Sequence, residues 1–168
     1  MHLGHTFRTD VLVLSLKSFN FDTNRMDDSF WYSLLYSILE GTSQALGIRR
    51  RDIDGCLYPI EEGRALVLFD AVPGGAGHVK RVADQQNLQE VLKCALSRVK
   101  NCSCGPETSC LDCLRNYQNQ FCHDLLKRGV VADFLSANLG SVLGDKGTQY
   151  PSQPMKIDKK DEQMKSDG

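Results

Sequence analysis

The chain has 168 residues, a formal net charge of −1 at pH 7 and a hydrophobic fraction of 41%. This length suits one domain with a core of its own, and the balanced charge argues against a strongly basic protein that wraps nucleic acid. No apolar run approaches the roughly 20 residues that span a bilayer, and the amino-terminus lacks the charged-then-apolar order of a signal peptide. We therefore expect a cytoplasmic protein without a membrane segment.

The first predicted element is a strand over Thr9–Phe19, which is rich in β-branched residues and leucine. It begins so close to Met1 that we expect the chain to be a piece of a larger protein. A long amphipathic helix follows, in which Asp28 or Ser29 can cap the start and Gly47 can end it.

Two further strands, Ile53–Ile60 and Ala65–Asp70, are joined by a tight turn at Glu61–Gly63, so a β-hairpin is their simplest pairing. After a glycine-rich turn, the next amphipathic helix is expected to begin at Asn87, with Glu90 three residues on as its capping-box partner.

The carboxy-terminal half predicts a helix over Leu111–Lys127, which Gly129 ends, and a short last helix over Val131–Asn138. From Gly144 onward the chain is polar and charged, which is typical of a disordered tail. We therefore predict an α+β fold, with a small sheet of about three strands packed by amphipathic helices. The domain is expected over residues 3–143 and the disordered tail over residues 144–168.

The number and placement of the cysteines indicate a reducing compartment. The chain has seven, whereas a secreted protein usually carries an even set spread along its length. Cys56 and Cys94 lie singly among apolar residues, where a thiol behaves as a small hydrophobic group. Four others lie within residues 102–113 and need a separate explanation.

The four clustered cysteines have the spacing of a zinc knuckle: C-x-C, five residues, then C-x-x-C. Disulfides are disfavoured because cysteines separated by one residue rarely bridge each other, and a thioredoxin-like pair lacks its preceding strand. Gly105 and Pro106 let the loop between the two pairs fold back, and Zn²⁺ takes four thiolates at about 2.3 Å. The predicted ligands are Cys102, Cys104, Cys110 and Cys113.

A shell of four thiolates leaves zinc no open position for water or substrate, so we expect a structural zinc that stabilises the fold by about 10 kcal/mol. Cys122 and His123 lie just downstream and are alternative ligands, but the four cysteines already complete the set. No catalytic residue is predicted.

The glycine-rich stretch "LFDAVPGGAGHV" is neither a G-x-G-x-x-G motif nor a P-loop, so we interpret Gly74, Gly75 and Gly77 as a structural turn. Asp70 with Glu61 or Glu62 would supply the paired acids of a metal-dependent nuclease. The acid-x-Lys sequence that such enzymes carry on a neighbouring strand is absent. A nuclease is therefore the least favoured function.

Three stretches in this order, "LGHTFRTDVLVL", "LFDAVPGGAGHV" and "SCLDCLRNYQNQ" after the C-x-C pair, resemble the MrfA-type zinc-binding (MZB) domain. That family occurs at the carboxy-terminal end of DEAD/DEAH-box superfamily 2 helicases and in a helicase-associated subunit of DISARM-type anti-phage systems. The resemblance covers roughly residues 3–138 and implies that the four cysteines bind zinc.

The resemblance further implies work on single-stranded or partly duplex DNA, in repair or phage defence. The chain itself has no Walker A motif and no DEAD/DEAH box, so it is not expected to hydrolyse ATP. We therefore predict a non-catalytic accessory domain that acts with a DEAD/DEAH-box helicase motor, in cis or in trans. It would contribute to DNA binding or to docking of the motor.

Polar residues after the knuckle could contact phosphates or stack on bases. The alternative is a solvated helix face with Arg115 hydrogen-bonding a zinc thiolate, which would leave a protein-interaction module without nucleic-acid contact. Such a module predicts an exposed apolar patch near the edge of the sheet. The candidate nucleic-acid-binding residues are Arg115, Asn116, Tyr117, Asn119, Lys127 and Arg128.

Overall fold

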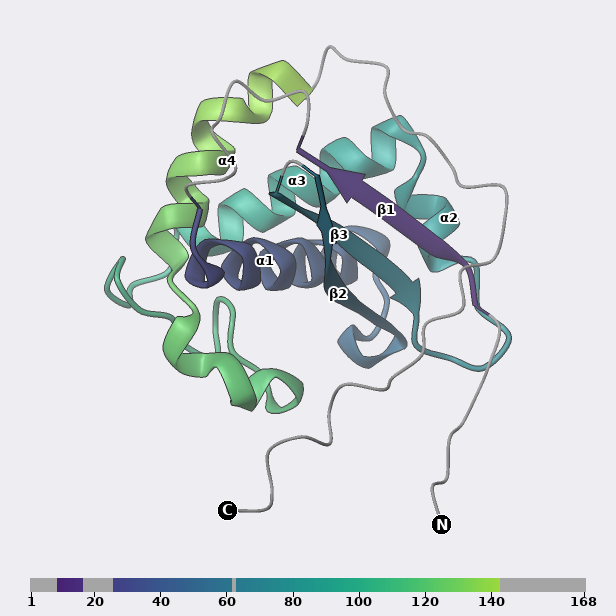
Figure 1. Cartoon of the computed structure of the whole chain (residues 1–168), viewed down its shortest axis with the longest axis horizontal. Helices are drawn as coiled ribbons and strands as arrows, with labels where there is room; N and C mark the ends of the chain where they lie inside the picture. The colour runs from purple at the N-terminus through teal and green to yellow at the C-terminus, as the bar shows by residue number, and fades with distance from the viewer. Residues whose placement is uncertain (1–8, 17–25, 62, 143–168) are drawn as a thin grey trace.

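The computed structural model describes residues 9–16, 26–61 and 63–142, in which all the strands precede α2 (His78–Val82) and only helices and loops follow (Figure 1). The predicted tail over residues 144–168 lies outside the described residues. None of the described helices is long and apolar enough to cross a membrane. The elements are β1 (Val11–Ser15), α1 (Asp28–Leu46), the 3-10 turn η2 (Arg50–Asp52), β2 (Ile53–Ile60), β3 (Gly63–Asp70), α2 (His78–Val82), α3 (Gln85–Lys100), the 3-10 helix η3 (Tyr117–Leu125) and α4 (Arg128–Val142).

The three described strands form one antiparallel sheet with the order β1-β3-β2. The predicted hairpin is confirmed: β2 pairs with β3 from Ile60 opposite Gly63 to Ile53 opposite Asp70. The strand β1 pairs with the other side of β3, beginning with Val11 opposite Phe69. The α+β class, with a small sheet packed by helices, is therefore the observed one.

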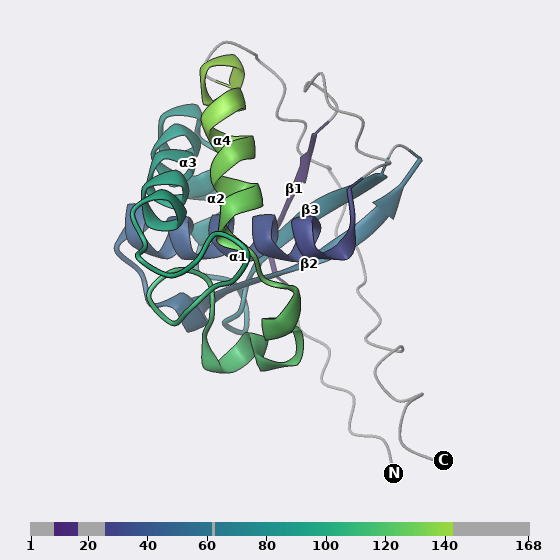
Figure 2. The same ribbon diagram turned by 90° about the vertical axis from the view of Figure 1, so that its left-hand side faces the viewer.

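Helix α1 is the centre of the fold, because it packs against the sheet on one side and against α3 and α4 on the other (Figure 2). Asp27, one residue before the predicted cap, accepts a hydrogen bond from the backbone N–H of Phe30 at 2.9 Å and begins the helix. Gly47 ends it with φ of 64°, as predicted. Apart from Tyr32, residues 29–42 are all buried, so α1 is covered on every side rather than amphipathic.

Small and hydroxyl side chains make this all-round burial of α1 possible. Ser37 and Thr42 donate hydrogen bonds back to the carbonyls of Leu34 and Ile38, both at 2.8 Å, and so bury no unpaired hydroxyl. Gly41 faces α3 so closely that a Cβ atom there would lie 2.5 Å from the carbonyl oxygen of Val91. The spacing between α1 and α3 therefore depends on this glycine.

The predictions for the start of α3 and for the helix after the cysteines were wrong. Asp84, not Asn87, caps α3, because its carboxylate accepts hydrogen bonds from the N–H groups of Gln86 and Asn87 at 3.1 Å. The helix expected over Leu111–Lys127 is a turn followed by η3, and α4 already begins at Arg128.

The turn replaces the helix because backbone groups there bond locally. The carbonyl of Cys110 accepts hydrogen bonds from the N–H groups of Cys113, Leu114 and Arg115 at 3.0–3.2 Å, which closes a tight loop instead of a helical ladder. Gly129 ends no helix; its N–H donates to the carbonyl of Pro106 at 2.9 Å in the first turn of α4. A Cβ at Gly129 would lie 2.8 Å from Pro106, so the cysteine loop and α4 touch at this glycine.

We predict that Gly41→Ala lowers the free energy of unfolding by about 1–3 kcal/mol, because the added methyl group forces α1 and α3 apart. Urea unfolding followed by circular dichroism measures the change. Gln44→Ala, at an exposed position of the same helix, is the matched control and should leave stability unchanged or slightly higher. An unchanged unfolding midpoint for Gly41→Ala would contradict the close approach.

Candidate metal centre

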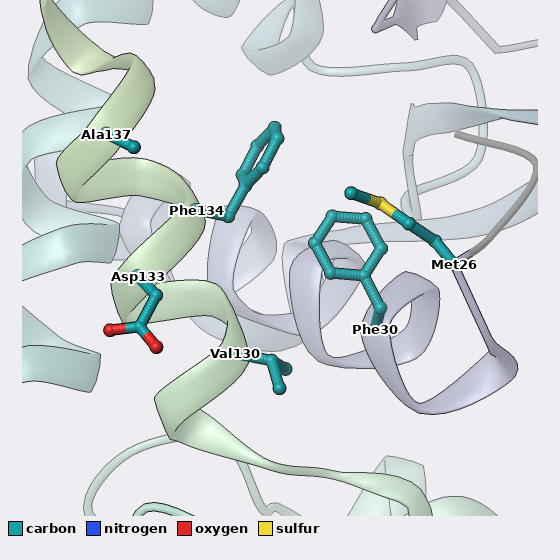
Figure 3. A pocket seen from close by; sticks show the side chains of 6 residues that line it. All are labelled: Met26, Phe30, Val130, Asp133, Phe134 and Ala137. Atoms are coloured by element: carbon teal, nitrogen blue, oxygen red, sulfur yellow. The ribbon is translucent and has the colours of Figure 1, made fainter. Parts of the chain in front are cut away.

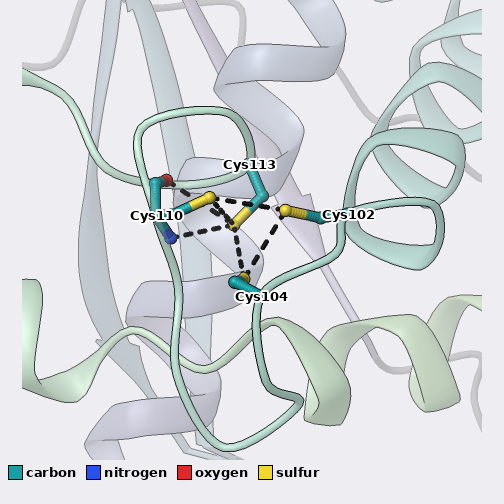
Figure 4. Close-up of side chains that lie close together, drawn as sticks. All are labelled: Cys102, Cys104, Cys110 and Cys113. Atoms are coloured by element: carbon teal, nitrogen blue, oxygen red, sulfur yellow. Dashed lines mark hydrogen bonds between the residues drawn. The ribbon is translucent and has the colours of Figure 1, made fainter.

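The four clustered cysteines bring their sulfur atoms together in one place (Figure 4). All four Sγ atoms lie within 4.8 Å of one another. The pairs Cys102–Cys104 and Cys102–Cys110 are 3.5 and 3.4 Å apart, and Cys104–Cys113 and Cys110–Cys113 are 3.8 and 3.9 Å apart. A tetrahedral zinc with bonds of about 2.3 Å requires sulfur–sulfur separations of about 3.8 Å. The donor set therefore fits zinc.

Two short segments supply these thiols. Cys102 and Cys104 follow the last turn of α3, where the N–H of Asn101 still bonds to the carbonyl of Ser97 at 3.0 Å. Cys110 and Cys113 lie on the tight turn closed by the Cys110 carbonyl, and the Cys110 N–H donates to the sulfur of Cys113 at 3.2 Å. A backbone N–H aimed at a ligand sulfur stabilises the thiolate that a metal needs.

Two arginines hold the backbone of the ligand loop. The Nε of Arg98 on α3 donates to the carbonyl of Cys113 at 2.8 Å. The Nε of Arg128 donates to the carbonyl of Cys104 at 2.7 Å, its Nη2 bonds to the same oxygen, and its Nη1 donates to the carbonyl of Val99 at 3.1 Å. Together, the two arginines position one ligand from each cysteine pair: Arg98 holds Cys113 and Arg128 holds Cys104. The role of Arg98 was not predicted from the sequence.

The thiols differ in acidity. The backbone N–H of Cys104 donates to the thiolate of Cys102 and lowers its pKa to about 7. Burial raises the pKa of Cys104 and, more strongly, the pKa of Cys113. Metal coordination at neutral pH therefore has to displace a proton from Cys104 and from Cys113.

The alternative ligands Cys122 and His123 lie outside this cluster, which is the one group of metal-ligating side chains among the described residues. Cys122 is buried beside Tyr36, and burial raises its pKa to about 11. The Nε2 of His123 lies 3.0 Å from the carbonyl oxygen of Asn116 and 2.9 Å from Oδ1 of Asn119. Both side chains pack η3 onto the domain.

Glu40 is a buried acid that the sequence analysis overlooked. Its carboxylate accepts a hydrogen bond from Nδ2 of Asn116 at 3.0 Å, and it lies 3.3 Å from Nε of Arg50 and 3.5 Å from Nη2 of Arg98. One charge on α1 therefore connects η2, α3 and the start of η3. Arg98 in turn connects this network to the cysteine loop.

The amides predicted to bind nucleic acid take part in folding η3. Asn116 caps η3 by accepting hydrogen bonds from the N–H groups of Gln118 and Asn119 at 2.9 and 3.1 Å. Asn119 accepts one from the N–H of Asn116 at 2.8 Å, which completes a capping box, and its own amide donates to the carbonyl of Leu114.

The predicted basic residues also have partners within the domain. Nε of Arg115 donates to the hydroxyl of Ser109 at 3.0 Å, and Lys127 forms an ion pair with Glu107 at 3.3 Å. Arg128 holds the cysteine loop, as described above. Tyr117 differs from the other candidates, because its side chain is 86% exposed.

The glycine turn folds around the carboxylate of Asp70. Gly74, Gly75 and Gly77 have φ values of 81°, 74° and 76°, which favour glycine. The Oδ2 of Asp70 accepts hydrogen bonds from the N–H groups of three successive residues, Ala76, Gly77 and His78, at 2.8, 2.8 and 3.2 Å, and Oδ1 accepts one from Val79 at 3.1 Å. Asp70 is fully buried. The turn thus supplies four donors to the chain's own carboxylate at the start of α2.

This arrangement does not resemble a nuclease site. Glu61 is exposed at the tip of the β2–β3 hairpin, whereas Asp70 lies at the opposite end of the same hairpin, opposite Ile53. Glu62 lies outside the described residues. The carboxylate of Asp70 is surrounded by N–H donors of its own chain, and Asp70 belongs to no group of three or more metal-ligating side chains among the described residues.

A shallow apolar groove of about 430 Å³ lies between the start of α1 and α4 (Figure 3). Phe30 and Phe134 meet edge to face there, with ring centroids 5.2 Å apart. The groove offers one acidic side chain and no convergent set of polar groups, so its chemistry is not that of an active site. Its lining residues are Met26, Phe30, Val130, Asp133, Phe134 and Ala137.

Comparison with known proteins agrees with the metal site. The family model of the MrfA Zn-binding domain matches residues 34–114, a segment that contains all four cysteines. The segment over residues 34–114 therefore matches the MrfA Zn-binding family. Druantia protein DruE of Escherichia coli (strain UMEA 4076-1) is 33% identical to it over 149 residues, which cover 79% of this chain and 8% of DruE.

Among solved structures, the DUF1998 helicase MrfA bound to DNA is similar, with a TM-score of 0.47 and 16% sequence identity. The likeness covers 66% of this chain and 15% of that chain. This chain therefore spans a small part of the length of both proteins. The zinc predicted from the cysteine spacing agrees with the family and with the cluster of thiols.

We predict that Arg98→Ala and Arg128→Ala each weaken zinc binding by about 10–100-fold, because outer hydrogen bonds orient the metal ligands. Competition with a chromophoric chelator measures the affinity. Lys93→Ala, on the exposed face of α3, is the control and should retain the affinity of the unchanged chain. Equal affinities for all three variants would show that the arginines do not position the ligands.

We predict that Asp70→Asn destabilises the zinc-loaded protein by about 2–4 kcal/mol. The side-chain NH₂ group of asparagine would replace one carboxylate oxygen and would face backbone N–H groups that need an acceptor. Asp84→Asn is the matched control, since Asn and Asp cap helices about equally well. Urea unfolding compares the two variants. Similar midpoints would contradict the four-donor turn.

Proposed function

We propose that this chain is a non-catalytic accessory domain of a DEAD/DEAH-box DNA helicase, in which a structural zinc holds a loop that docks the motor. The motor would lie in the same polypeptide or in a separate subunit. The proposal places the domain in the cytoplasm, where a reducing environment keeps the thiols available to the metal.

The zinc ligands in this proposal are Cys102, Cys104, Cys110 and Cys113. Four thiolates close the coordination shell, and a closed shell stabilises a fold without activating water or substrate. The loop over residues 101–116 has few buried apolar residues; Cys113 and Leu114 are the two that are fully covered. Without a metal, few interactions would offset the conformational entropy that this loop loses when it becomes ordered.

The helicase context is supported by the family to which the matched segment belongs. MrfA, after which the zinc-binding domain is named, is described as a helicase. The domain in this chain carries the four cysteines within the matched residues. A module of this type is expected to work beside a motor rather than alone.

Docking on a protein is favoured over contact with DNA by one observation: the basic and amide side chains after the knuckle have partners inside the domain. Arg115, Lys127 and Arg128 are bound to Ser109, Glu107 and the Cys104 carbonyl. A phosphate would have to break these contacts before it could be bound, which reduces the gain from each new ion pair.

Direct contact with single-stranded DNA is the second candidate, supported by the exposure of Tyr117. An aromatic ring that is 86% exposed can stack on a base, and stacking tolerates any sequence. This candidate predicts binding of an oligothymidine that weakens with salt and with Arg115→Ala or Lys127→Ala.

The test of docking is co-purification of the chain with the helicase motor encoded in the same or the neighbouring gene, the two being expressed as separate chains. We expect the zinc-loaded chain to bind the motor, and Cys104→Ser with Cys113→Ser to abolish binding because the loop loses its metal. Cys56→Ser, a half-buried thiol outside the cluster, is the control and should bind normally. A gel-shift assay with oligothymidine runs in parallel. Binding of DNA without binding of the motor would contradict docking.

A further inference from the structure

The exposed apolar side chains of this domain concentrate beside the metal loop. Of the five large hydrophobic side chains that are exposed in the described part of the chain, four lie between residues 111 and 125. We define the η3 surface as these four residues. They are Leu111, Tyr117, Phe121 and Leu125, with exposed fractions of 71%, 86%, 73% and 38%.

The segment that carries three of these side chains is held along one side of α1. The hydroxyl of Ser29 donates to the carbonyl of Leu125, the ring of Tyr32 meets the edge of Phe121 at 6.1 Å, and Glu40 binds Asn116. These contacts run in antiparallel order along α1, so η3 is anchored at both ends and at its middle. The exposed rings are thus presented on a fixed backbone, which lowers the entropy cost of binding a partner.

Two acidic side chains are neighbours of the η3 surface in the sequence. Asp112 follows Leu111, Asp124 precedes Leu125, and both are exposed. Neither carboxylate forms an ion pair or a hydrogen bond with the described residues, whereas Arg115, His123 and Lys127 are all engaged within the domain. The exposed charged groups next to Leu111 and Leu125 that lack a partner among the described residues are therefore carboxylates.

We propose that the η3 surface is the contact site for a segment of the helicase motor that combines apolar side chains with lysine or arginine, an inference that rests on the proposed function. Aromatic side chains are the residues that most often dominate binding energy at protein interfaces. The two free carboxylates attract a cationic segment and repel the phosphates of DNA, so charge complementarity selects a basic protein segment.

The experiment measures the affinity of the separately expressed motor for the zinc-loaded chain by biolayer interferometry. Tyr117→Ala and Phe121→Ala are each expected to weaken binding at least tenfold. Tyr58→Ala, an exposed ring on β2, is the matched control and should bind as the unchanged chain does. Zinc content and circular dichroism are measured on every variant to confirm that it is folded. If Phe121→Ala unfolds, Tyr117→Ala still tests the surface, because a side chain that is almost fully exposed contributes little to folding.

The charge argument is tested with Asp112→Lys and Asp124→Lys, which should also weaken motor binding about tenfold. Asp133→Lys, on the exposed side of α4, is the control with the same change in net charge. Raising the salt concentration from about 50 to 300 mM should weaken binding of the unchanged chain but affect the two lysine variants less.

The outcomes separate this inference from the function on which it rests. If the unchanged chain does not bind the motor, the proposed docking function fails and the surface assignment fails with it. If the unchanged chain binds and the η3 variants bind equally well, docking stands and the η3 surface is not the contact site. If Tyr117→Ala abolishes binding of oligothymidine while motor binding is unchanged, the surface binds single-stranded DNA and the proposal is wrong.

Discussion

The loop between α3 and α4 depends on the convergence of four thiols, because it has little else to hold it in shape. Residues 101–116 contain no helix or strand, and three of their side chains are buried, those of Ser109, Cys113 and Leu114. Apart from the buried side chains of Cys113 and Leu114, the loop is held by polar contacts: Arg98 and Arg128 bind the carbonyls of Cys113 and Cys104. Zinc and the two arginines therefore act on the same backbone, one from inside the loop and the others from the neighbouring helices.

Glu40 connects this loop to the rest of the domain. This buried carboxylate contacts Arg98, which holds the loop, and Asn116, which caps η3. Separating this buried carboxylate from any of its three polar partners would cost free energy, because its charge would then be less well compensated. The position of η3 on α1 is in this way coupled to the geometry of the cysteines, although no zinc ligand lies on η3.

Most of the fold was accessible from the sequence, and the exceptions have physical causes. The hairpin was predicted because the tight turn at Glu61–Gly63 separates two predicted strands, and Gly47 correctly marked the end of α1. The all-round burial of α1 was missed because Ser37 and Thr42 look like solvent-facing residues until their bonds to their own helix are known. The helix over Leu111–Lys127 was wrong because three N–H groups bond to the carbonyl of Cys110.

The site was predictable to a similar extent. Cysteine spacing alone predicted a four-thiol cluster, and the structure brings those sulfurs together. The roles of Arg98 and Arg128 were not predictable, because a charged residue at a helix end is usually solvated and nothing local indicates which carbonyl it will reach. A single acid inside the apolar run around Glu40 was a signal that could have been used, since an unpaired charge is rarely buried.

The turn around Asp70 makes the geometry of the β3–α2 junction insensitive to dissolved anions. Successive N–H groups in such a turn form a pocket of the kind that proteins use to hold phosphate or sulfate. Here the occupant is covalently part of the chain and has no translational freedom to lose, so dissolved anions compete with it poorly. The junction of β3 and α2 thereby keeps one geometry, whatever the phosphate concentration around it.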